Sequence, residues 1–459
     1  MTLSRLASLG IVLFSPVLAF GVATGMTTTT CILLTGLIVT IYTSIGGLKA
    51  VIWTDVVQFS LMLAGLIAIL VKGTNDIGGV GEVLERNSRG GRIELFNFDF
   101  NPYLSNNIWT VVLGTSFVYT ACYSIDQLAV QRSISLPSIR KAKRALYWVL
   151  FGMVLIHFLV IYFGMLIYAN FYKCDPTKTK QISRIDEIVT LYVSEIFKSS
   201  QPGMLGLFVT CIFSASLSTL SSGLNAIAAL IWEDWLKSLL PNIRTKWARF
   251  ITKFISALTG LIVIGAAFLA MNIGTIFEAS FILVGAPIGP LFGLFVLGVF
   301  FPFVDASGAL FGLIFGQVIS VWITLGASFN KIGKGVQLIL PASTDDCDKL
   351  GFPNITEGTS FEQLKYSRIP NYSPNKLNAL YHLSPLFVPV ITFSATVLTG
   401  VLIGAIFERR AKSKIRPELH CKLVNIIYGV SGVKEKLLSN NEICRQDKNA
   451  KLSIELEFL

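Results

Sequence analysis

The chain has 459 residues, of which 53% are hydrophobic and only 14% charged, and its mean hydropathy is +0.65. Soluble domains carry about 25% charged residues, so this composition excludes an ordinary soluble protein, a disordered chain and a small disulfide-rich domain. The net charge of +11 would suit nucleic acid in a soluble protein. Here apolar stretches of about 20 residues recur along the chain, which indicates a polytopic helical membrane protein with no nucleic-acid partner.

The hydropathy predicts an all-α protein with about ten transmembrane helices. In chain order, the expected spans lie near residues 6–22, 27–45, 50–71, 108–131, 145–170, 203–232, 249–271, 274–301, 306–327 and 387–407. Residues 1–410 would then form one transmembrane domain. Residues 411–459 would form a polar cytoplasmic tail.

Basic residues in the connections predict the orientation. The loop 132–144 holds five basic residues and no acidic one, and the loop 233–253 and the start of the tail are also rich in Lys and Arg. Strict alternation through ten spans places all three on the same side of the membrane. Because Lys and Arg accumulate on the cytoplasmic side, we expect both termini to be cytoplasmic.

The opposite side would carry the long loops and two further features. Asn354 begins the sequence Asn-Ile-Thr, which is either a glycosylation acceptor or a chance match. Cys174 and Cys347 are the cysteines expected in outer loops, where they would form a disulfide or remain two free thiols. The chain has three histidines and no Cys-x-x-Cys pair, so a zinc centre is not expected.

The expected span 203–232 is unusually polar. Ser214, Ser218, Ser221, Ser222 and Asn225 recur at offsets of three and four residues, and therefore share one helix face. Hydroxyl side chains let membrane helices pack closely, which would explain some of them. Alternatively, hydroxyl and carbonyl oxygens are the ligands of a sodium site.

Two further groups of polar residues lie within expected spans. Asp55 begins the third span, where it could cap the helix N-terminus or bind a cation. Tyr119, Tyr123 and Gln127 follow one another at four-residue intervals, as an interfacial aromatic belt or as the lining of a cavity. Nearby, Asp126 and Arg132 could pair with each other or mark the water interface; we favour the interface for Arg132.

Four stretches resemble the sodium/solute symporter family. They are Tyr42–Asp55, Asp126–Arg132, Ser218–Asp234 and the glycine-rich Gly289–Gly298. Their order and spacing are most similar to the branch of sodium-coupled monocarboxylate, multivitamin and iodide transporters, and the resemblance extends to about residue 410. It implies the inverted-repeat fold of the bacterial leucine transporter, which works by alternating access.

The resemblance also implies where ligands would bind. A sodium site would use the carbonyl of Ala215 with the hydroxyls of Ser218 and Thr219. A second site, for sodium or a proton, would use Asp55 with Ser221 and Ser222. Tyr123 and Gln127 fall at positions that line the substrate cavity in this family, and Tyr119 and Asn225 belong to the same candidate set.

Compared with the family, about three N-terminal helices are expected to be missing, so the chain resembles an N-terminally truncated member. The resemblance implies a plasma-membrane symporter that couples sodium to a small organic anion, with sodium as coupling ion and no other cofactor. The alternatives are a non-transporting sensor or regulatory protein on the same fold, or an inactive truncated isoform. No His-Glu cluster or activated nucleophile indicates an enzyme, and no feature of the sequence predicts the oligomeric state.

Overall fold

The computed structural model of the chain is all-helical in the residues that it describes. These residues are 2–93, 96–103, 107–179, 181–182, 184–197, 203–240, 243–272, 275–329, 343–344, 347 and 378–407. Asn354 and the tail at 411–459 lie outside the described residues, so glycosylation and the cytoplasmic tail stay predictions.

The helices follow one another with short connections. Their bounds are α1 Thr2–Thr24, α2 Thr28–Ile77, α3 Val80–Arg89, η1 Thr110–Thr115, α4 Ser116–Ile125, α5 Gln127–Ile134, α6 Ile139–Asn170, η2 Ile185–Glu187, α7 Ile188–Phe197, α8 Met204–Ile231, η3 Trp232–Leu236, α9 Lys237–Leu239, α10 Thr245–Ala270, α11 Ile276–Ser280, η4 Phe281–Gly285, α12 Ala286–Phe300, α13 Ala306–Phe329, η8 Asn378–His382 and α14 Val388–Phe407.

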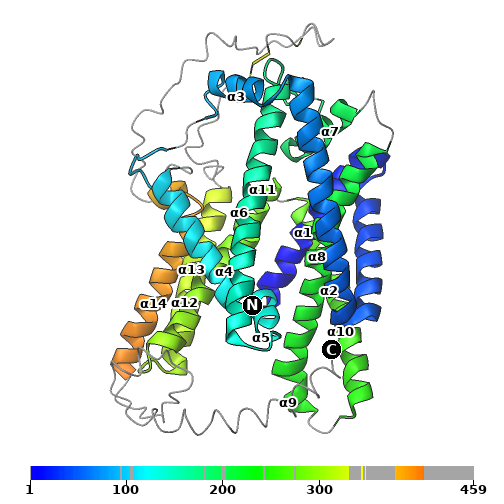
Figure 1. Cartoon of the computed structure of the whole chain (residues 1–459). Coiled ribbons are helices and arrows are strands. Elements are labelled where there is room, and N and C mark those ends of the chain that lie inside the picture. Colours follow the sequence, from blue (N-terminus) through cyan, green and yellow to red (C-terminus); the bar gives the residue numbers. More distant parts are fainter. Residues whose placement is uncertain are drawn as a thin grey trace.

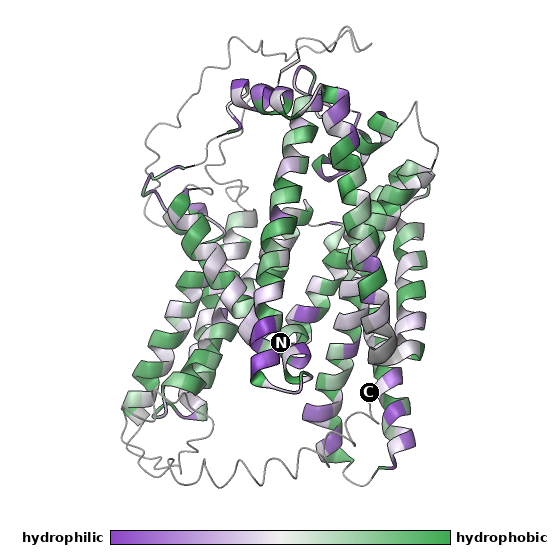
Figure 2. Ribbon diagram, viewed as in Figure 1, coloured by the Kyte–Doolittle hydropathy of each residue, from purple (hydrophilic) through white to green (hydrophobic). Residues whose placement is uncertain are grey.

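Two packed groups of helices make up most of the molecule (Figure 1). In one group α1, α2, α8 and α10 pack against each other around a shared core that includes Leu9, Phe14, Ile32, Leu220 and Ile264. In the other, α12, α13 and α14 pack together, and α4 contacts α12. Figure 2 shows hydrophobic residues along the length of the long helices and hydrophilic residues mainly near their ends. This distribution is typical of helices that cross a bilayer.

Nine helices of the described chain are long and apolar enough to cross a membrane. The remaining expected span, 108–131, is divided in the structure. A shorter apolar helix runs from Thr110 to Ile125, and a separate helix, α5, begins at Gln127. Asp126 causes the break, because its backbone is extended (φ −71°, ψ 126°) and its carboxylate accepts a hydrogen bond from the amide of Leu128, at 3.2 Å. Hydropathy does not detect this cap, because the residues on both sides are largely apolar.

The start of the next long helix also differs from the expected boundary. α6 begins at Ile139, six residues before the expected residue 145. The Ser138 hydroxyl caps it by accepting a hydrogen bond from the amide of Lys141, at 3.3 Å. The hydropathy marks only the apolar part of a helix, whereas the cap starts it within the basic loop.

The element α2 folds back on itself. Tyr42 donates a hydrogen bond to the carbonyl of Leu217, whereas Asp55 accepts one from the adjacent Ser218. Thirteen residues of straight helix would separate Tyr42 and Asp55 by about 20 Å, yet the two contact consecutive residues of α8. The two apolar segments of α2 therefore lie side by side and run in opposite directions along the bundle (Figure 1); they are Thr28–Gly46 and Trp53–Ile77.

Glycines allow the helices of the first group to approach closely. A Cβ atom at Gly10 of α1 would lie 2.7 Å from the backbone carbon of Ala266 in α10. One at Gly260 of α10 would lie 2.2 Å from the Thr40 hydroxyl oxygen in α2. Small residues at such crossings are typical of membrane helix packing.

Replacing Gly10 with alanine is therefore expected to destabilise the bundle. The added methyl group would meet backbone rather than a flexible side chain, and overpacking of this kind costs about 1–3 kcal/mol. The thermal unfolding midpoint of the purified protein in detergent should fall. Gly265→Ala, in the same helix pair but with no heavy atom within 4 Å of the added Cβ, serves as the control. Equal midpoints for the two variants would contradict the close α1–α10 contact.

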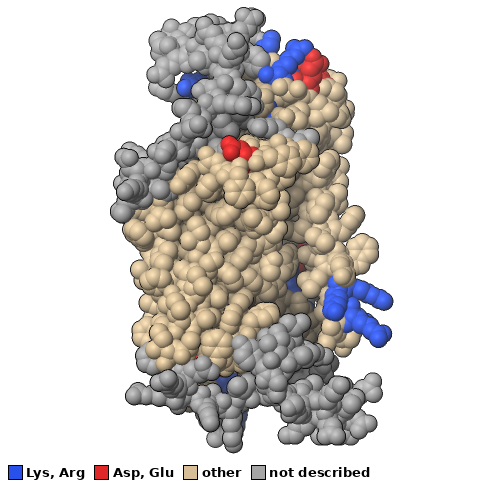
Figure 3. Space-filling view, turned by 90° about the vertical axis from the view of Figure 1, so that its left-hand side faces the viewer, with Lys and Arg blue, Asp and Glu red and all other residues tan. Residues whose placement is uncertain are grey.

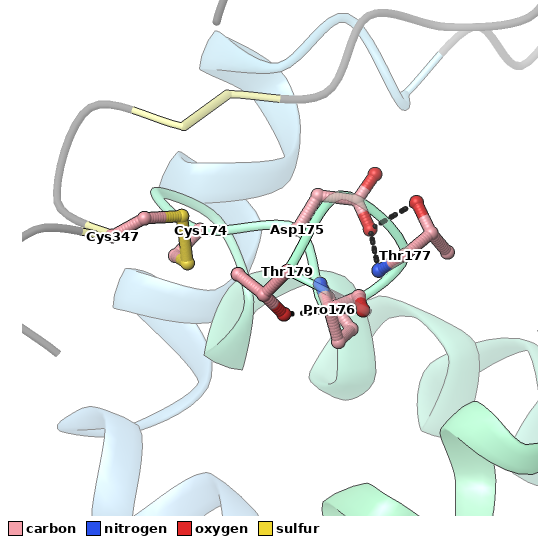
Figure 4. Close-up of a disulfide and its surroundings, with 6 residues drawn as sticks. All are labelled: Cys174, Asp175, Pro176, Thr177, Thr179 and Cys347. Atoms are coloured by element: carbon pink, nitrogen blue, oxygen red, sulfur yellow. Dashed lines mark hydrogen bonds between the residues drawn. A yellow bond between two sulfur atoms is a disulfide. The ribbon is translucent and has the colours of Figure 1, made fainter. Parts of the chain in front are cut away.

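A disulfide lies at the end of the bundle where α6 finishes. It joins Cys174, just after α6, to Cys347 across 173 residues (Figure 4). Close to it, the carboxylate of Asp175 accepts hydrogen bonds from both the amide and the hydroxyl of Thr177, at 2.8 Å each. The pair of cysteines is thus oxidised in the structure and ties a distant part of the chain to the end of α6.

Candidate functional site

A carboxylate faces hydroxyl groups between α2 and α8. The Ser218 hydroxyl donates a hydrogen bond to Asp55 Oδ1 at 2.6 Å, and the Ser222 hydroxyl donates one to Oδ2 at 3.5 Å. The Asp55 side chain is 18% exposed. Both serines lie on α8 four residues apart, one turn of helix, so the two hydroxyls point to the same side and share one acceptor. Asp55 is therefore more than a helix cap: it links two helices.

Arg132 of α5 completes this cluster from a third element. Its Nη2 atom lies 2.8 Å from Asp55 Oδ2 and 2.8 Å from the Ser222 hydroxyl oxygen. Arg132 therefore pairs with Asp55 and not with Asp126. The expectation that Arg132 only marks the water interface is wrong in this respect, although its side chain is 63% exposed. A charged group inside a membrane bundle needs a partner of opposite charge, and here the partner is 77 residues away.

The other members of the polar face of α8 hydrogen-bond within the helix or lie buried. The Ser221 hydroxyl donates to the carbonyl of Ser218 at 3.2 Å, and Ser221 is fully buried. Hydroxyls that bond a carbonyl one turn back are already satisfied without an ion. Ser221 therefore lies next to the Asp55 cluster without touching the carboxylate.

The three residues of the first expected sodium site are not grouped around one point. Thr219 donates a hydrogen bond to the carbonyl of Ala215 at 3.3 Å, and this pair lies on an exposed part of α8. Ser218 is engaged with Asp55 instead. The two expected sites therefore adjoin at Ser218, which is within reach of either set of oxygens.

A second ion pair holds the break between α4 and α5. The guanidinium of Arg5 in α1 donates to the carboxylate of Asp126. The same carboxylate caps α5, so one residue fixes the start of the helix that carries Arg132. The two ion pairs together connect α5 to α1, α2 and α8.

Two pockets adjoin this break. One, of about 500 Å³, is lined by residues of α4, α5 and α6 that include Tyr119, Tyr123, Asp126 and Arg132. The other, of about 90 Å³, is lined by residues of α1, α4, α5, α8 and α12 that include Arg5, Ser8, Asp126 and Gln127. Cys122 and Asp126 line both pockets.

The expected substrate residues are thus divided between these pockets. Tyr119 and Tyr123 face the larger pocket, and the Tyr119 hydroxyl lies 2.9 Å from Nε2 of His157 in α6. Gln127 lines the smaller pocket. Asn225 lines neither; its side-chain nitrogen is buried without a hydrogen-bond partner in the described part of the chain. The structure does not bring the four residues into one cavity.

The chemistry of the site is that of oxygen ligands. No group of three or more His, Cys, Asp or Glu side chains that could hold a metal occurs among the described residues. The Asp55 cluster instead offers two carboxylate and two hydroxyl oxygens, which are ligands that a hard monovalent cation prefers. In the structure, the guanidinium of Arg132 supplies the positive charge at this point.

Two residues of the cluster region are not among the ligands predicted from the sequence. Arg5 is absent from the predicted set, and Arg132 is predicted at the interface. The signal in the sequence is the rule that each ionised side chain within a membrane span needs an opposite charge. Applied to Asp55, Asp126, Arg5 and Arg132 together, that rule requires two pairs, although it does not say which two.

Comparisons with known proteins match this chain to membrane transporters. A model described as the sodium:solute symporter family matches residues 8–316. Sodium-coupled monocarboxylate transporter 2 of Mus musculus is 34% identical over 417 residues, which are 91% of this chain and 66% of the relative. Sodium-coupled monocarboxylate transporter 1 of Mus musculus is 36% identical over 400 residues, 86% of this chain and 65% of the relative. The chain thus spans slightly less than two thirds of the length of these relatives.

The fold is also similar to that of a solved structure. A Na+-coupled sialic acid symporter in a substrate-bound outward-open state superposes with a TM-score of 0.65 at 21% identity, over 88% of this chain and 72% of that chain. At this identity the likeness concerns the fold, and it agrees with the inverted-repeat architecture expected from the sequence.

Proposed function

The chain belongs to the sodium:solute symporter family, and from this premise we propose that it couples the binding of sodium to the movement of a small organic anion across the plasma membrane. The observation that carries the proposal is the cluster of Asp55, Ser218 and Ser222 between α2 and α8. A carboxylate and hydroxyls from two helices form a site whose geometry changes when the helices move. Binding of a cation there is thereby coupled to conformation, as alternating access requires.

Sodium would use these oxygens together with neighbouring ones. Asp55 supplies the negative charge, Ser218 and Ser222 supply hydroxyl oxygens, and Ser221 lies one helical step away. Thr219 and the Ala215 carbonyl would serve a first sodium site that shares Ser218 with the second. The inward sodium gradient would then drive the cycle, since one charge crossing 100 mV is worth about 2.3 kcal/mol.

The proposed substrate class rests on the relatives and on the pockets. The two mouse relatives are sodium-coupled monocarboxylate transporters by name. In this chain the pockets at the α4–α5 break carry the guanidinium groups of Arg5 and Arg132. A cationic, partly apolar lining suits a small anion with an apolar part, such as a monocarboxylate.

The proposed orientation rests on the two ends of α6. Its first turns carry Arg140, Lys141, Lys143 and Arg144, whereas the disulfide of Cys174 follows its last turn. Basic residues favour the cytoplasmic side, and disulfides persist on the oxidising side. We therefore place the α5 end of the bundle in the cytoplasm and the disulfide outside.

Uptake in cells expressing the protein tests this function. Radiolabelled monocarboxylates should enter faster in sodium than in choline medium, and uptake should saturate with sodium concentration. A surface-expressed protein that binds sodium without supporting uptake of any anion in a panel would favour the non-transporting sensor instead.

Removing Arg132 is expected to strengthen sodium binding. Because its Nη2 atom occupies the same oxygens that a cation would use, sodium must displace it from Asp55 and Ser222. In Arg132→Gln, the half-saturating sodium concentration should fall roughly three- to tenfold, which corresponds to the 0.2–1 kcal/mol of an exposed pair and a little more for its partly buried acid. Arg140→Gln, an exposed basic residue on α6, is the control. A higher half-saturating concentration in Arg132→Gln would show that the arginine organises the site rather than competing for it.

A further inference from the structure

A group of basic side chains projects from the start of α6. It consists of Arg140, Lys141, Lys143 and Arg144, here called the α6 basic cluster, and all four side chains are exposed. Within the described part of the chain, the salt bridges form between other residues. The sequence offers no acid nearby either, since residues 127–170 contain no Asp or Glu. Figure 3 shows basic side chains standing out from the lower right-hand edge of the molecule.

Other exposed cations of the described chain differ from this cluster. Lys72 pairs with Asp76, Arg89 with Glu85 and Lys237 with Glu233, each across one turn of helix. The cations of the α6 basic cluster instead repel one another. They also lie in the first turns of a helix, where the helix dipole disfavours positive charge. An external anion would relieve both costs.

The face of α6 that follows the cluster is apolar and lies on the outside of the bundle. Arg140, Arg144, Tyr147 and Phe151 follow one another at offsets of four, three and four residues, so they share one face of the helix. Tyr147 is 71% exposed and Phe151 is 63% exposed, and Phe158 two turns further on is exposed as well. Charge, then an aromatic ring with a polar tip, then apolar surface is the order met on passing from the headgroups into the bilayer.

From this arrangement we propose that the α6 basic cluster binds the headgroup of an anionic phospholipid, whose acyl chains lie along the apolar face of α6. A soluble anion would use the charges but not the exposed aromatic and apolar face beside them. An anionic lipid uses both, and clusters of Lys and Arg beside a membrane helix attract such lipids. The proposal concerns the outer surface of α6 and does not depend on sodium coupling.

Lipid binding by the purified full chain in neutral detergent tests the proposal. Fluorescent phosphatidylserine is titrated against the protein, with phosphatidylcholine carrying the same label for comparison. The double variant Arg140→Gln/Arg144→Gln removes two charges of the cluster. The double variant Lys72→Gln/Arg89→Gln removes two charges that are paired with acids elsewhere, and is the matched control.

We expect phosphatidylserine to bind roughly tenfold more tightly than phosphatidylcholine. This preference should be lost in Arg140→Gln/Arg144→Gln and kept in the control variant. It should also weaken in the wild type as salt is raised, which needs no variant to fold. An unchanged preference in Arg140→Gln/Arg144→Gln would overturn the proposal. Displacement of the lipid by free phosphoserine at equal concentration would also overturn it, because the site would then be one for soluble anions.

Discussion

Replacing Asp55 with asparagine is expected to weaken sodium binding roughly ten- to hundredfold. The substitution keeps the shape of the side chain and removes the negative charge that faces Ser218 and Ser222. Interactions with a charged group contribute about 1.5–3 kcal/mol each, and 1.4 kcal/mol corresponds to a factor of ten. The half-saturating sodium concentration of transport, or the dissociation constant of the purified protein, measures the effect.

The control for Asp55→Asn is Asp76→Asn. Asp76 lies on the same element, α2, but pairs with Lys72 at a site away from the Asp55 cluster. Surface expression should be close to normal in both variants, since the side-chain carbonyl oxygen introduced by Asp55→Asn can still accept the Ser218 hydrogen bond. An unchanged sodium dependence in Asp55→Asn would reduce the carboxylate to a structural partner of Arg132.

Ser218→Ala is expected to have the next largest effect. The Ser218 hydroxyl touches Asp55 directly at 2.6 Å and adjoins the oxygens of Ala215 and Thr219, so its removal affects both proposed sodium sites. We expect about a tenfold rise in the half-saturating sodium concentration, with little change in protein abundance, because alanine packs well in its place. Thr219→Ala should raise it less, since the Thr219 hydroxyl donates only to its own helix in the structure.

Thr210→Ala provides the matched control on the same helix. Its hydroxyl also donates to a carbonyl one turn back, that of Gly206, but on an exposed part of α8 away from Asp55. If Ser218→Ala behaves like Thr210→Ala, the polar face of α8 serves helix packing and not ion binding.

The sequence predicted the parts of this fold that depend on hydropathy. The long apolar helices follow from stretches of about 20 residues, and the polar face of α8 follows from offsets of three and four residues. The α4–α5 break could not be predicted in this way. No glycine or proline lies beside Asp126, and the break depends on a carboxylate that caps α5 and pairs with Arg5 of a distant helix.

The site was predictable in its residue types and not in its pairings. Asp55 and the serines of α8 stand out because polar groups are costly at membrane depth. Which cation faces Asp55 depends instead on how α5 packs against α2 and α8, and that is a property of the tertiary structure. The sequence therefore suggested Asp126 as a partner of Arg132, whereas the fold places Arg132 at Asp55, 77 residues away.

The most direct test of the account is an equilibrium measurement of radioactive sodium binding to the purified chain. The wild type, Asp55→Asn and Asp76→Asn are compared in potassium-balanced buffer. The account predicts saturable binding that unlabelled sodium displaces and potassium does not, lost or strongly weakened in Asp55→Asn and retained in Asp76→Asn. Equal sodium binding by the wild type and Asp55→Asn would contradict the assignment of a sodium site to the α2–α8 cluster.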